Sequence, residues 1–348
     1  MLERLAPCFI VTWVAACGGR PAPPPPAASL ASVQTLRAEG IALPGVTAPL
    51  WLDYLFFEPG RARVWIPAGS SGTVDVLDVA KHTISSIAGF KTLEREAHGK
   101  KRLLGPSSGA IGDRYAYIGN RATRELCSVD LASLKLRSCL ELPATPDGVE
   151  YCPSTRELWV TTPDARAIAV LDGSVPGRPK LRDRIALNGE PEGYAIDEAH
   201  GLFLTNLEDS GSTLRIDMRS HQVKDTWSAG CASDGPRGIA VDSVRSMILV
   251  ACTDHIQVLD AAHGGARLGK LDVDAGIDNI AYAERSGLLY VAAAKSGRLS
   301  VAHLDDAGQL VIRATGETSL GARNAVVDQD GVAYVVDARN ARLLVLRP

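Results

Sequence analysis

The order of hydrophobic and polar positions in residues 191–217 recurs along most of this chain. A short apolar segment begins at Pro191 and ends at Asp197, a second segment is centred on Phe203, and a third, alternating segment ends at Asp217. Apolar or alternating segments of this length, bounded by Gly, Pro and Asp, are typical of β-strands. The pattern therefore predicts three consecutive strands joined by short turns.

The same pattern returns along the chain at a nearly constant spacing. The centre of its second strand is found at Trp65, Tyr117, Trp159, Phe203, Leu249, Tyr290 and Tyr334. An Asp ends the third strand in five repeats, at Asp78, Asp130, Asp172, Asp217 and Asp260. Neighbouring centres are between 41 residues (249 to 290) and 52 residues (65 to 117) apart. Repeats of about 40 to 50 residues that contain only strands indicate propeller blades. We predict an all-β fold, a seven-bladed β-propeller with four-stranded antiparallel blades.

The last repeat lacks a strand at the end of the chain. Residues 343–348 correspond to its third strand, so we expect the fourth strand to come from another part of the chain. Residues 33–41, near the start of the repeat region, have the composition of a strand and would complete that blade. Closure by this N-terminal strand (Velcro closure) would hide two sheet edges that otherwise invite aggregation.

Three of the second strands carry a family resemblance. Residues 115–120, 158–162 and 289–293, each followed by a strand rich in Ile, Val or Leu, resemble the YVTN-type repeats of seven-bladed β-propellers. The resemblance covers residues 32–348 and implies the fold. It implies no activity, because the same scaffold carries unrelated functions.

The second repeat contains additional residues. The surplus is residues 90–104, which are rich in Lys, Arg and Glu, and an insertion of this kind belongs on a surface loop. It would either contact a partner or form a solvent-exposed loop.

The N-terminal residues have the pattern of a targeting segment. Apolar residues 9–14 follow Arg4, and small residues precede Cys17. This resembles a bacterial lipoprotein signal, which implies that residues 1–16 are removed and that Cys17 carries lipid. Gly18 after the cysteine implies an outer-membrane lipoprotein of the cell envelope, facing the periplasm or the outside. An ordinary secretory signal that is cut nearby is the alternative.

A proline-rich segment separates this signal from the repeats. Residues 17–31 include four consecutive prolines, which favour an extended polyproline conformation. We interpret them as a tether between the lipidated cysteine and a propeller domain at residues 32–348. A proline-rich ligand for an aromatic groove of a partner is the alternative.

The charge of the chain excludes one class of partner. Its 348 residues carry a net charge of −3 and no concentrated basic cluster, which argues against nucleic-acid binding. The expected partners are the membrane, through the lipid anchor, and an envelope protein or a small ligand, with the chain as a monomer.

Five cysteines remain after Cys8 leaves with the signal and Cys17 takes the lipid. Cys127 and Cys139 flank a turn between neighbouring strands, and Cys231 and Cys252 fall in the fifth repeat. In an oxidising envelope both pairs are disulfide candidates. Cys152 is then most simply a small buried hydrophobic residue.

The candidate functional residues come from the start of each innermost strand, beside the central channel. The position before the motif glycine, or before the residue that replaces this glycine, is occupied in the seven repeats by Asp53, Ser108, Asp147, Glu192, Arg237, Asp278 and Arg323. This ring would bind a polar ligand, hold a metal, or simply form the hydrated ion pairs of a channel lining.

A second, partial resemblance concerns a metal at this position. The gluconolactonase and senescence-marker type of propeller holds a divalent cation through acids and asparagines of the inner strands. The resemblance implies Asp53, Asp147, Glu192 and Asp278 as ligands of an ion such as Ca²⁺. Arg237 and Arg323 do not suit a cation site, and we expect no cofactor. The function that the sequence favours is non-enzymatic binding or scaffolding, and the alternative is a metal-dependent hydrolase or lactonase.

Overall fold

The computed structural model describes residues 32–347 apart from 47, 51, 98–99 and 233–234. From Val33 onward the chain forms one compact unit. The predicted signal peptide, the lipidated Cys17 and most of the tether lie outside the described residues. Within the described part, no helix is both long and apolar enough to cross a membrane.

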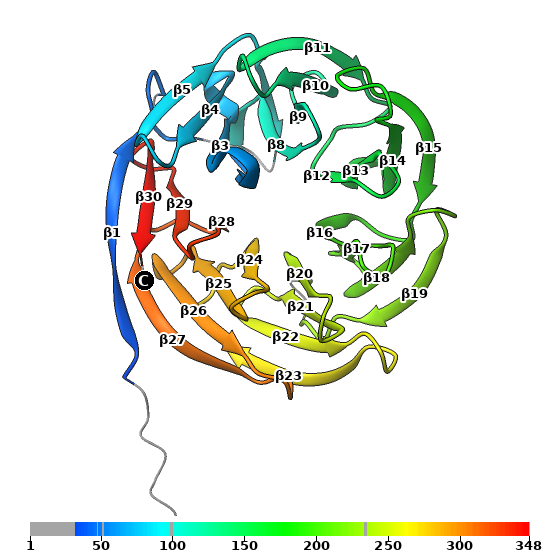
Figure 1. Ribbon diagram of the computed structural model, residues 1–348, viewed down its shortest axis with the longest axis vertical. Helices are drawn as coiled ribbons and strands as arrows, with labels where there is room; N and C mark the ends of the chain where they lie inside the picture. The colour runs from blue at the N-terminus through cyan, green and yellow to red at the C-terminus, as the bar shows by residue number, and fades with distance from the viewer. Residues whose placement is uncertain (1–31, 47, 51, 98–99, 233–234, 348) are drawn as a thin grey trace, which may run out of the picture. The chain divides into compact units, whose positions relative to one another are not determined.

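Seven units of four antiparallel strands follow one another around a ring (Figure 1). The first two blades consist of β2 (Phe56–Glu58), β3 (Arg63–Ala68), β4 (Thr73–Asp78) and β5 (Thr83–Ile87), then β8 (Pro106–Ile111), β9 (Tyr115–Asn120), β10 (Glu125–Asp130) and β11 (Lys135–Glu141). The third and fourth consist of β12 (Val149–Cys152), β13 (Glu157–Thr162), β14 (Ala167–Asp172) and β15 (Lys180–Ala186), then β16 (Pro191–Asp197), β17 (Leu202–Leu207), β18 (Ser212–Asp217) and β19 (Val223–Ser228).

The last three blades continue the same order from the inner to the outer strand. They consist of β20 (Ile239–Asp242), β21 (Met247–Ala251), β22 (His255–Asp260) and β23 (Ala266–Asp272), of β24 (Ile280–Ala283), β25 (Leu288–Ala293), β26 (Arg298–Leu304) and β27 (Leu310–Glu317), and of β28 (Ala325–Val327), β29 (Ala333–Asp337), β30 (Arg342–Arg347) and β1 (Gln34–Ala42). Short 3-10 turns lie at η1 (Pro59–Arg61), η2 (Gly69–Ser71) and η3 (Pro163–Ala165). The predicted seven-bladed β-propeller is confirmed.

Strand β1 closes the ring, as the sequence predicts. It pairs antiparallel with β30, from Arg37 opposite Arg347 to Ala42 opposite Arg342. Its first residues also pair in parallel with β27, which joins the sixth and seventh blades into one eight-stranded sheet. The N-terminal strand therefore covers the open edges of two blades.

The residues used to align the repeats form the core of the blades. Trp65, Trp159, Phe203, Tyr290 and Tyr334 are among the largest fully buried side chains. They pack between neighbouring blades; the rings of Trp159 in the third blade and Phe203 in the fourth, for example, are stacked with centroids 4.8 Å apart. Burial of one large apolar side chain per blade explains why this position recurs in the sequence.

The recurring Asp stabilises the turn after the third strand. In Asp130, Asp172 and Asp217, Oδ1 accepts a hydrogen bond at 2.8 Å from the backbone N of a residue two or three positions further on. Asp78 and Asp260 do the same at 3.0 and 2.9 Å. Hydrogen bonds from these turns hold the pKa of all five carboxyls below the ordinary value. The Asp is therefore a structural part of the repeat.

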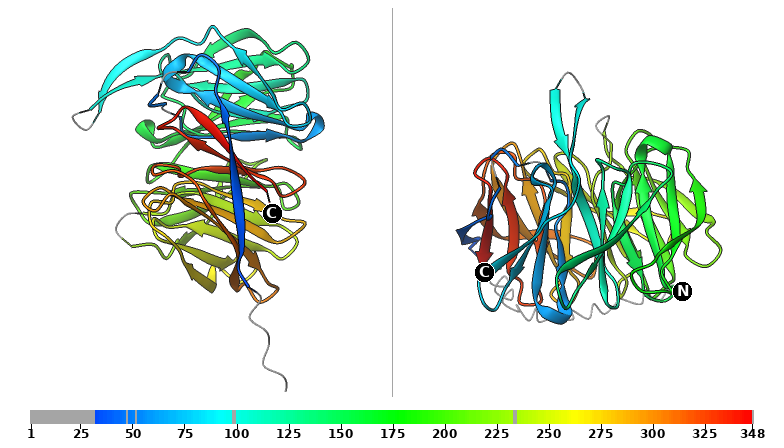
Figure 2. Two further views of the ribbon diagram at one scale, coloured as in Figure 1. Left: turned by 90° about the vertical axis from the view of Figure 1, so that its left-hand side faces the viewer. Right: turned by 90° about the horizontal axis from the view of Figure 1, so that it is seen from above.

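The surplus of the second repeat forms a hairpin. Strands β6 (Leu93–Ala97) and β7 (Lys100–Leu104) pair with each other only and stand out from one face of the ring (Figure 2, cyan). The hairpin lies between β5 and β8, where the chain passes from the outer strand of one blade to the inner strand of the next. The predicted surface insertion is therefore an ordered pair of strands.

Both predicted disulfides are present. Cys127 on β10 is bonded to Cys139 on β11, and Cys231 is bonded to Cys252. Cys152 at the end of β12 is a buried free thiol whose pKa is raised by burial. It has neither the exposure nor the thiolate character of a reactive cysteine.

Candidate functional site

The predicted ring residues meet at one mouth of the central channel. All seven innermost strands begin on the face of the ring that bears the β6–β7 hairpin, and residues from each of them line one central cavity. Six of the seven predicted residues, Asp53, Asp147, Glu192, Arg237, Asp278 and Arg323, form ion pairs there together with Arg121 and Glu208. We call these eight residues the charged ring.

One half of the charged ring is centred on Asp53. Arg323 Nη2 lies 2.8 Å from Asp53 Oδ1, and Arg323 Nε lies 3.3 Å from Asp278 Oδ2. Arg121 pairs with the other oxygen of Asp53 and also with Asp147, whose side chain is only 5% exposed. Both carboxylate oxygens of Asp53 are therefore occupied by guanidinium groups.

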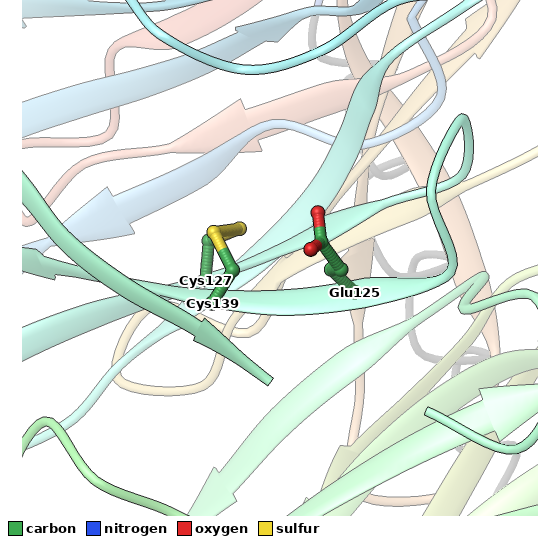
Figure 3. A group of neighbouring side chains, drawn as sticks. All are labelled: Glu125, Cys127 and Cys139. Carbon is green, nitrogen blue, oxygen red and sulfur yellow. A yellow bond between two sulfur atoms is a disulfide. The ribbon is translucent and has the colours of Figure 1, made fainter. Parts of the chain in front are cut away.

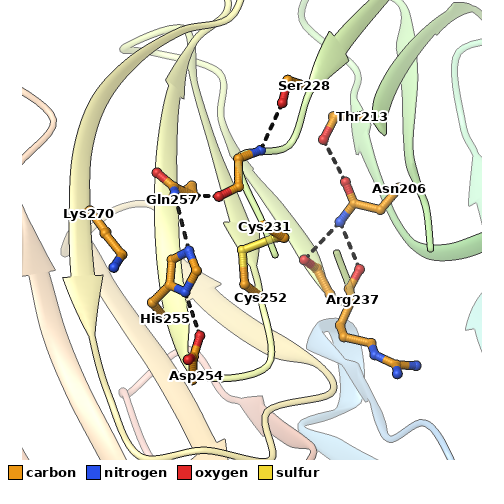
Figure 4. The surroundings of a disulfide bond; sticks show 12 residues. Asn206, Thr213, Ser228, Cys231, Arg237, Cys252, Asp254, His255, Gln257 and Lys270 are labelled. Atoms are coloured by element: carbon orange, nitrogen blue, oxygen red, sulfur yellow. Dashed lines mark hydrogen bonds and ion pairs between the residues drawn. A yellow bond between two sulfur atoms is a disulfide. The ribbon is translucent and has the colours of Figure 1, made fainter. Parts of the chain in front are cut away.

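The other half is centred on Arg237. Its Nη2 lies 2.7 Å from Glu208 Oε1 and its Nη1 lies 3.9 Å from Glu192 Oε1. The amide of Asn206 donates hydrogen bonds to the carbonyl oxygens of Arg237 and Gly238, at 2.8 and 3.1 Å (Figure 4). The backbone that carries Arg237 is thus held by a buried side chain of the neighbouring blade.

The ring carries more negative than positive charge. Among the described residues, five carboxyl groups share three guanidinium groups. Burial raises the pKa of Glu192 to about 7, and the nearby charges of Asp278 and Glu208 act in the same direction. Burial also raises the pKa of Asp278, against the opposing effect of Arg323. Near neutral pH, Glu192 at the channel mouth therefore gains or loses a proton readily.

Ser108 does not take part in this network. The ladder of β8 with β9 shifts its register between Pro106 and Ser108, which leaves Ser107 in a bulge. The carbonyl oxygen of Ser107 accepts a hydrogen bond at 2.9 Å from the backbone N–H of Tyr54 in the preceding blade. The carbonyl oxygen of Asp278 accepts the equivalent hydrogen bond from Gly238 of its own preceding blade. Ser107 therefore holds the equivalent place in the second blade, and Ser108 is buried within the sheet.

Two members of the ring do not follow from the repeat alignment. Arg121 and Glu208 each come directly after the second strand of a blade, β9 or β17. This turn lies beside the start of the inner strands and faces the same channel mouth. A charged residue directly after the second strand is the sequence signal that would have identified both.

Among the described residues, the four acids Asp53, Asp147, Glu192 and Asp278 do not form a close group of potential ligand atoms. In the part of the chain that the structure describes, the only group of three potential ligand residues whose ligand atoms lie within 4.8 Å of one another is Glu125, Cys127 and Cys139 (Figure 3). Their two sulfur atoms form a disulfide and cannot act as thiolate ligands. At the channel mouth, Asp53, Asp147, Glu192 and Asp278 form ion pairs with arginine side chains.

A groove borders the charged ring on the same face. It has a volume of about 380 Å³ and lies between the β6–β7 hairpin and the loops of the third blade. Arg95, Glu96 and Arg102 contribute from the hairpin, and Thr145 and Asp164 contribute from the third blade. Arg121 and Asp147 also line the groove, so that the charged ring forms its inner wall.

Comparison with known proteins supports the fold and leaves the activity open. No family model matches the sequence, and no curated protein is significantly similar to it. The fold resembles a chain in the crystal structure of the mitotic checkpoint complex, at 13% identity over 97% of this chain and 99% of that one, with a TM-score of 0.71. It also resembles Kuenenia stuttgartiensis hydrazine synthase, at 17% identity over 87% and 97%, with a TM-score of 0.72.

A third similar structure is a single domain. The Cps50 (Swd1) β-propeller domain of Myceliophteria thermophila is 11% identical over 88% of this chain and 98% of that one, with a TM-score of 0.68. At these identities the likeness concerns the β-propeller fold alone.

Proposed function

We propose that this β-propeller is a YVTN-type lipoprotein that acts as a non-enzymatic binding module for a protein partner in the cell envelope. The face that bears the charged ring and the β6–β7 hairpin is the binding face. Cys17 carries the lipid that holds the chain at the outer membrane. In this proposal residues 17–31, which lie outside the described residues, connect the lipid to the propeller domain.

The observation that carries this proposal is the groove between the hairpin and the third blade. Arg95 and Arg102 give it positive charge and Glu96 and Asp164 give it negative charge, while Leu104 adds an apolar side chain. A mixed surface of this size suits the polar and apolar side chains of a protein segment. Among the described residues the hairpin has no counterpart in the other blades, and the hairpin strands take no part in the pairing that closes the ring.

The hydrolase alternative has less support from the same residues. A catalytic cation at the mouth needs carboxylate oxygens that are free to bind it. Asp53 uses both oxygens for Arg121 and Arg323, and Asp278 uses one for Arg323. The presence of a similar propeller in the mitotic checkpoint complex supports a binding role in general terms.

The proposal is tested with a variant of the full-length chain in which residues 94–103 are replaced by a short Gly-Ser link. Leu93 and Leu104 are paired neighbours, so that a short link can join them without strain on the ring. The matched control is Val244→Ser, at a residue that is 84% exposed in the turn between β20 and β21 on the opposite face.

The measurement is quantitative mass spectrometry of envelope proteins that co-purify with each chain. We expect a partner that is retained by the wild type and by Val244→Ser and is lost from the hairpin variant. A Cys17→Ala variant should move from the membrane fraction to the soluble fraction. Co-purification of the same proteins with the hairpin variant would refute the binding face, and membrane retention of Cys17→Ala would refute the anchor.

A further inference from the structure

The central cavity lies inside the channel, beyond the charged ring, and is separate from the groove. Its volume is about 420 Å³, and residues from all seven innermost strands line it. Tyr54 and Tyr194 stand at the end next to the ring, with their ring centroids 5.4 Å apart. Phe56 and Phe57 line the side formed by the first blade, and Ile239 and Ile280 line the opposite side. We call this cavity the inner chamber.

The inner chamber contains one carboxylate. Glu150, on β12, is the only acidic residue among the described residues that line it. Its Oε1 accepts a hydrogen bond at 3.0 Å from the backbone N of Tyr151. No Lys, Arg or His of the described chain forms an ion pair with it, in contrast to the acids of the charged ring. The chamber therefore combines an uncompensated negative charge with aromatic and aliphatic walls.

The groups around Glu150 make its charge sensitive to pH. Glu198, which follows β16, adds negative charge, and Tyr194 and Cys152 are the other titratable side chains that interact with it. Burial is the main cause that raises the pKa of Glu150, to about 7, and the charge of Glu198 raises it further. A positive charge placed in the chamber would lower the pKa of Glu150 again and keep its carboxylate ionised.

We propose that the inner chamber binds a small organic ammonium compound, whose cation meets the Glu150 carboxylate and whose apolar part packs against the aromatic residues of the first and fourth blades.

The walls of the chamber select this class of ligand. Cations are attracted to the faces of aromatic rings, and quaternary and primary ammonium groups are recognised in proteins by aromatic residues together with a carboxylate. An anion would be repelled by Glu150, and a neutral apolar molecule would leave the carboxylate desolvated without a partner. The volume of the chamber lies in the range of pockets for small molecules.

Binding of a cation should be linked to loss of a proton. The ligand requires ionised Glu150, so its affinity should rise as the pH increases through about 7 and should level off above it. Below that pH, binding should release close to one proton per ligand. This behaviour depends on Glu150 and is independent of the protein partner proposed above.

The test is isothermal titration calorimetry on the full-length chain in a neutral detergent, with benzylamine, benzyltrimethylammonium and benzyl alcohol as probes. The two cations should bind, and benzyl alcohol, which has a similar shape and no charge, should bind at least about tenfold more weakly. Glu150→Gln should lose at least about tenfold in affinity for benzylamine at pH 8, a change of about 1.4 kcal/mol.

Glu198→Gln is the matched control. It removes a neighbouring carboxylate that does not line the chamber, so it should keep benzylamine binding at pH 8 and improve it at pH 6, because the pKa of Glu150 falls. If Glu150→Gln does not fold, proton release by the wild type, measured in buffers of different ionisation enthalpy, replaces it. Equal binding of benzyl alcohol, an unchanged affinity of Glu150→Gln, or no binding of benzylamine at millimolar concentration would overturn the proposal.

Discussion

Arg323 Nη2 lies 2.8 Å from Asp53 Oδ1, although the two residues are 270 positions apart in the sequence. Asp53 precedes the first blade and Arg323 precedes the inner strand of the seventh, so the contact bridges the junction at which the ring closes. Strand β1, which comes shortly before Asp53 in the sequence, is the outermost strand of the seventh blade, so the chain itself also links the seventh blade to the first. The charged ring and the closure of the propeller are therefore parts of one structural arrangement.

Closure by β1 predicts a large effect of a single substitution. Leu36 is 4% exposed and packs with Leu346 and Ala314 of the two blades that β1 joins. Leu36→Ala should lower the free energy of unfolding by about 2–4 kcal/mol, because it removes apolar contacts and leaves a cavity. Chemical denaturation measures this change. Val33→Ala, at a residue that is 51% exposed, should have little effect. Equal effects of both variants would contradict the closure.

The pairing of acids with arginines predicts how the mouth responds to metal ions. Neither EDTA nor Ca²⁺ should change the Tm of the wild type. Arg121→Gln should lower the free energy of unfolding by about 1–3 kcal/mol, because it leaves the buried Asp147 without its arginine and removes one of the two arginines that pair with Asp53. Arg124→Gln, which removes only an exposed pair, should change it by less than about 0.5 kcal/mol. A Tm that falls on addition of EDTA would favour the hydrolase alternative.

The raised pKa of Glu192 predicts a pH dependence of stability. Its pKa is about 7 in the folded chain against an ordinary value of 4.5, so the folded state keeps a proton that the unfolded state has lost. The contribution of Glu192 is therefore fully present below pH 4.5 and is lost as the pH rises to about 7. Unfolding free energies of Glu192→Gln, measured from pH 4 to 8, should fall less steeply than those of the wild type. Parallel curves would contradict the assignment.

Gly148 makes room for an aromatic wall of the inner chamber. A Cβ at this position would lie 2.0 Å from Cε1 of Tyr194, so that the tyrosine ring would have to move. Gly148→Ala should lower the free energy of unfolding by about 1–3 kcal/mol and alter the near-UV circular dichroism. Gly60→Ala, where nothing lies within 4 Å of the added Cβ, is the control. An unchanged spectrum of Gly148→Ala would show that Tyr194 does not occupy this position.

The sequence predicted the elements that repeat. Trp65, Phe203 and the other aligned centres are buried in the core, and the Asp that ends the third strand recurs because the turn needs its side chain. The number of blades and the role of β1 followed from the same periodicity. Both disulfides followed from the strand positions of their cysteines and from the expected oxidising environment. These features depend on local patterns that each blade must satisfy separately.

The features that the sequence did not predict lie where the repeats differ. Arg121 and Glu208 reach the charged ring from turns whose composition varies from blade to blade, and the bulge at Ser107 moves the register of β8 by one residue. Glu150 occupies an ordinary strand position, and only the closed ring places it in a cavity. Such contacts depend on the three-dimensional relation between blades, which a single repeat does not encode.

The most direct test of the binding role is site-specific photo-cross-linking in intact cells that express the full-length chain. A photoreactive residue replaces Glu96 on the exposed surface of the hairpin, or Val244 on the opposite face, in otherwise identical chains. We predict a cross-linked envelope protein at position 96 and none at position 244. Adducts at position 244 alone, or at neither position, would contradict the assignment of the hairpin face as the binding face.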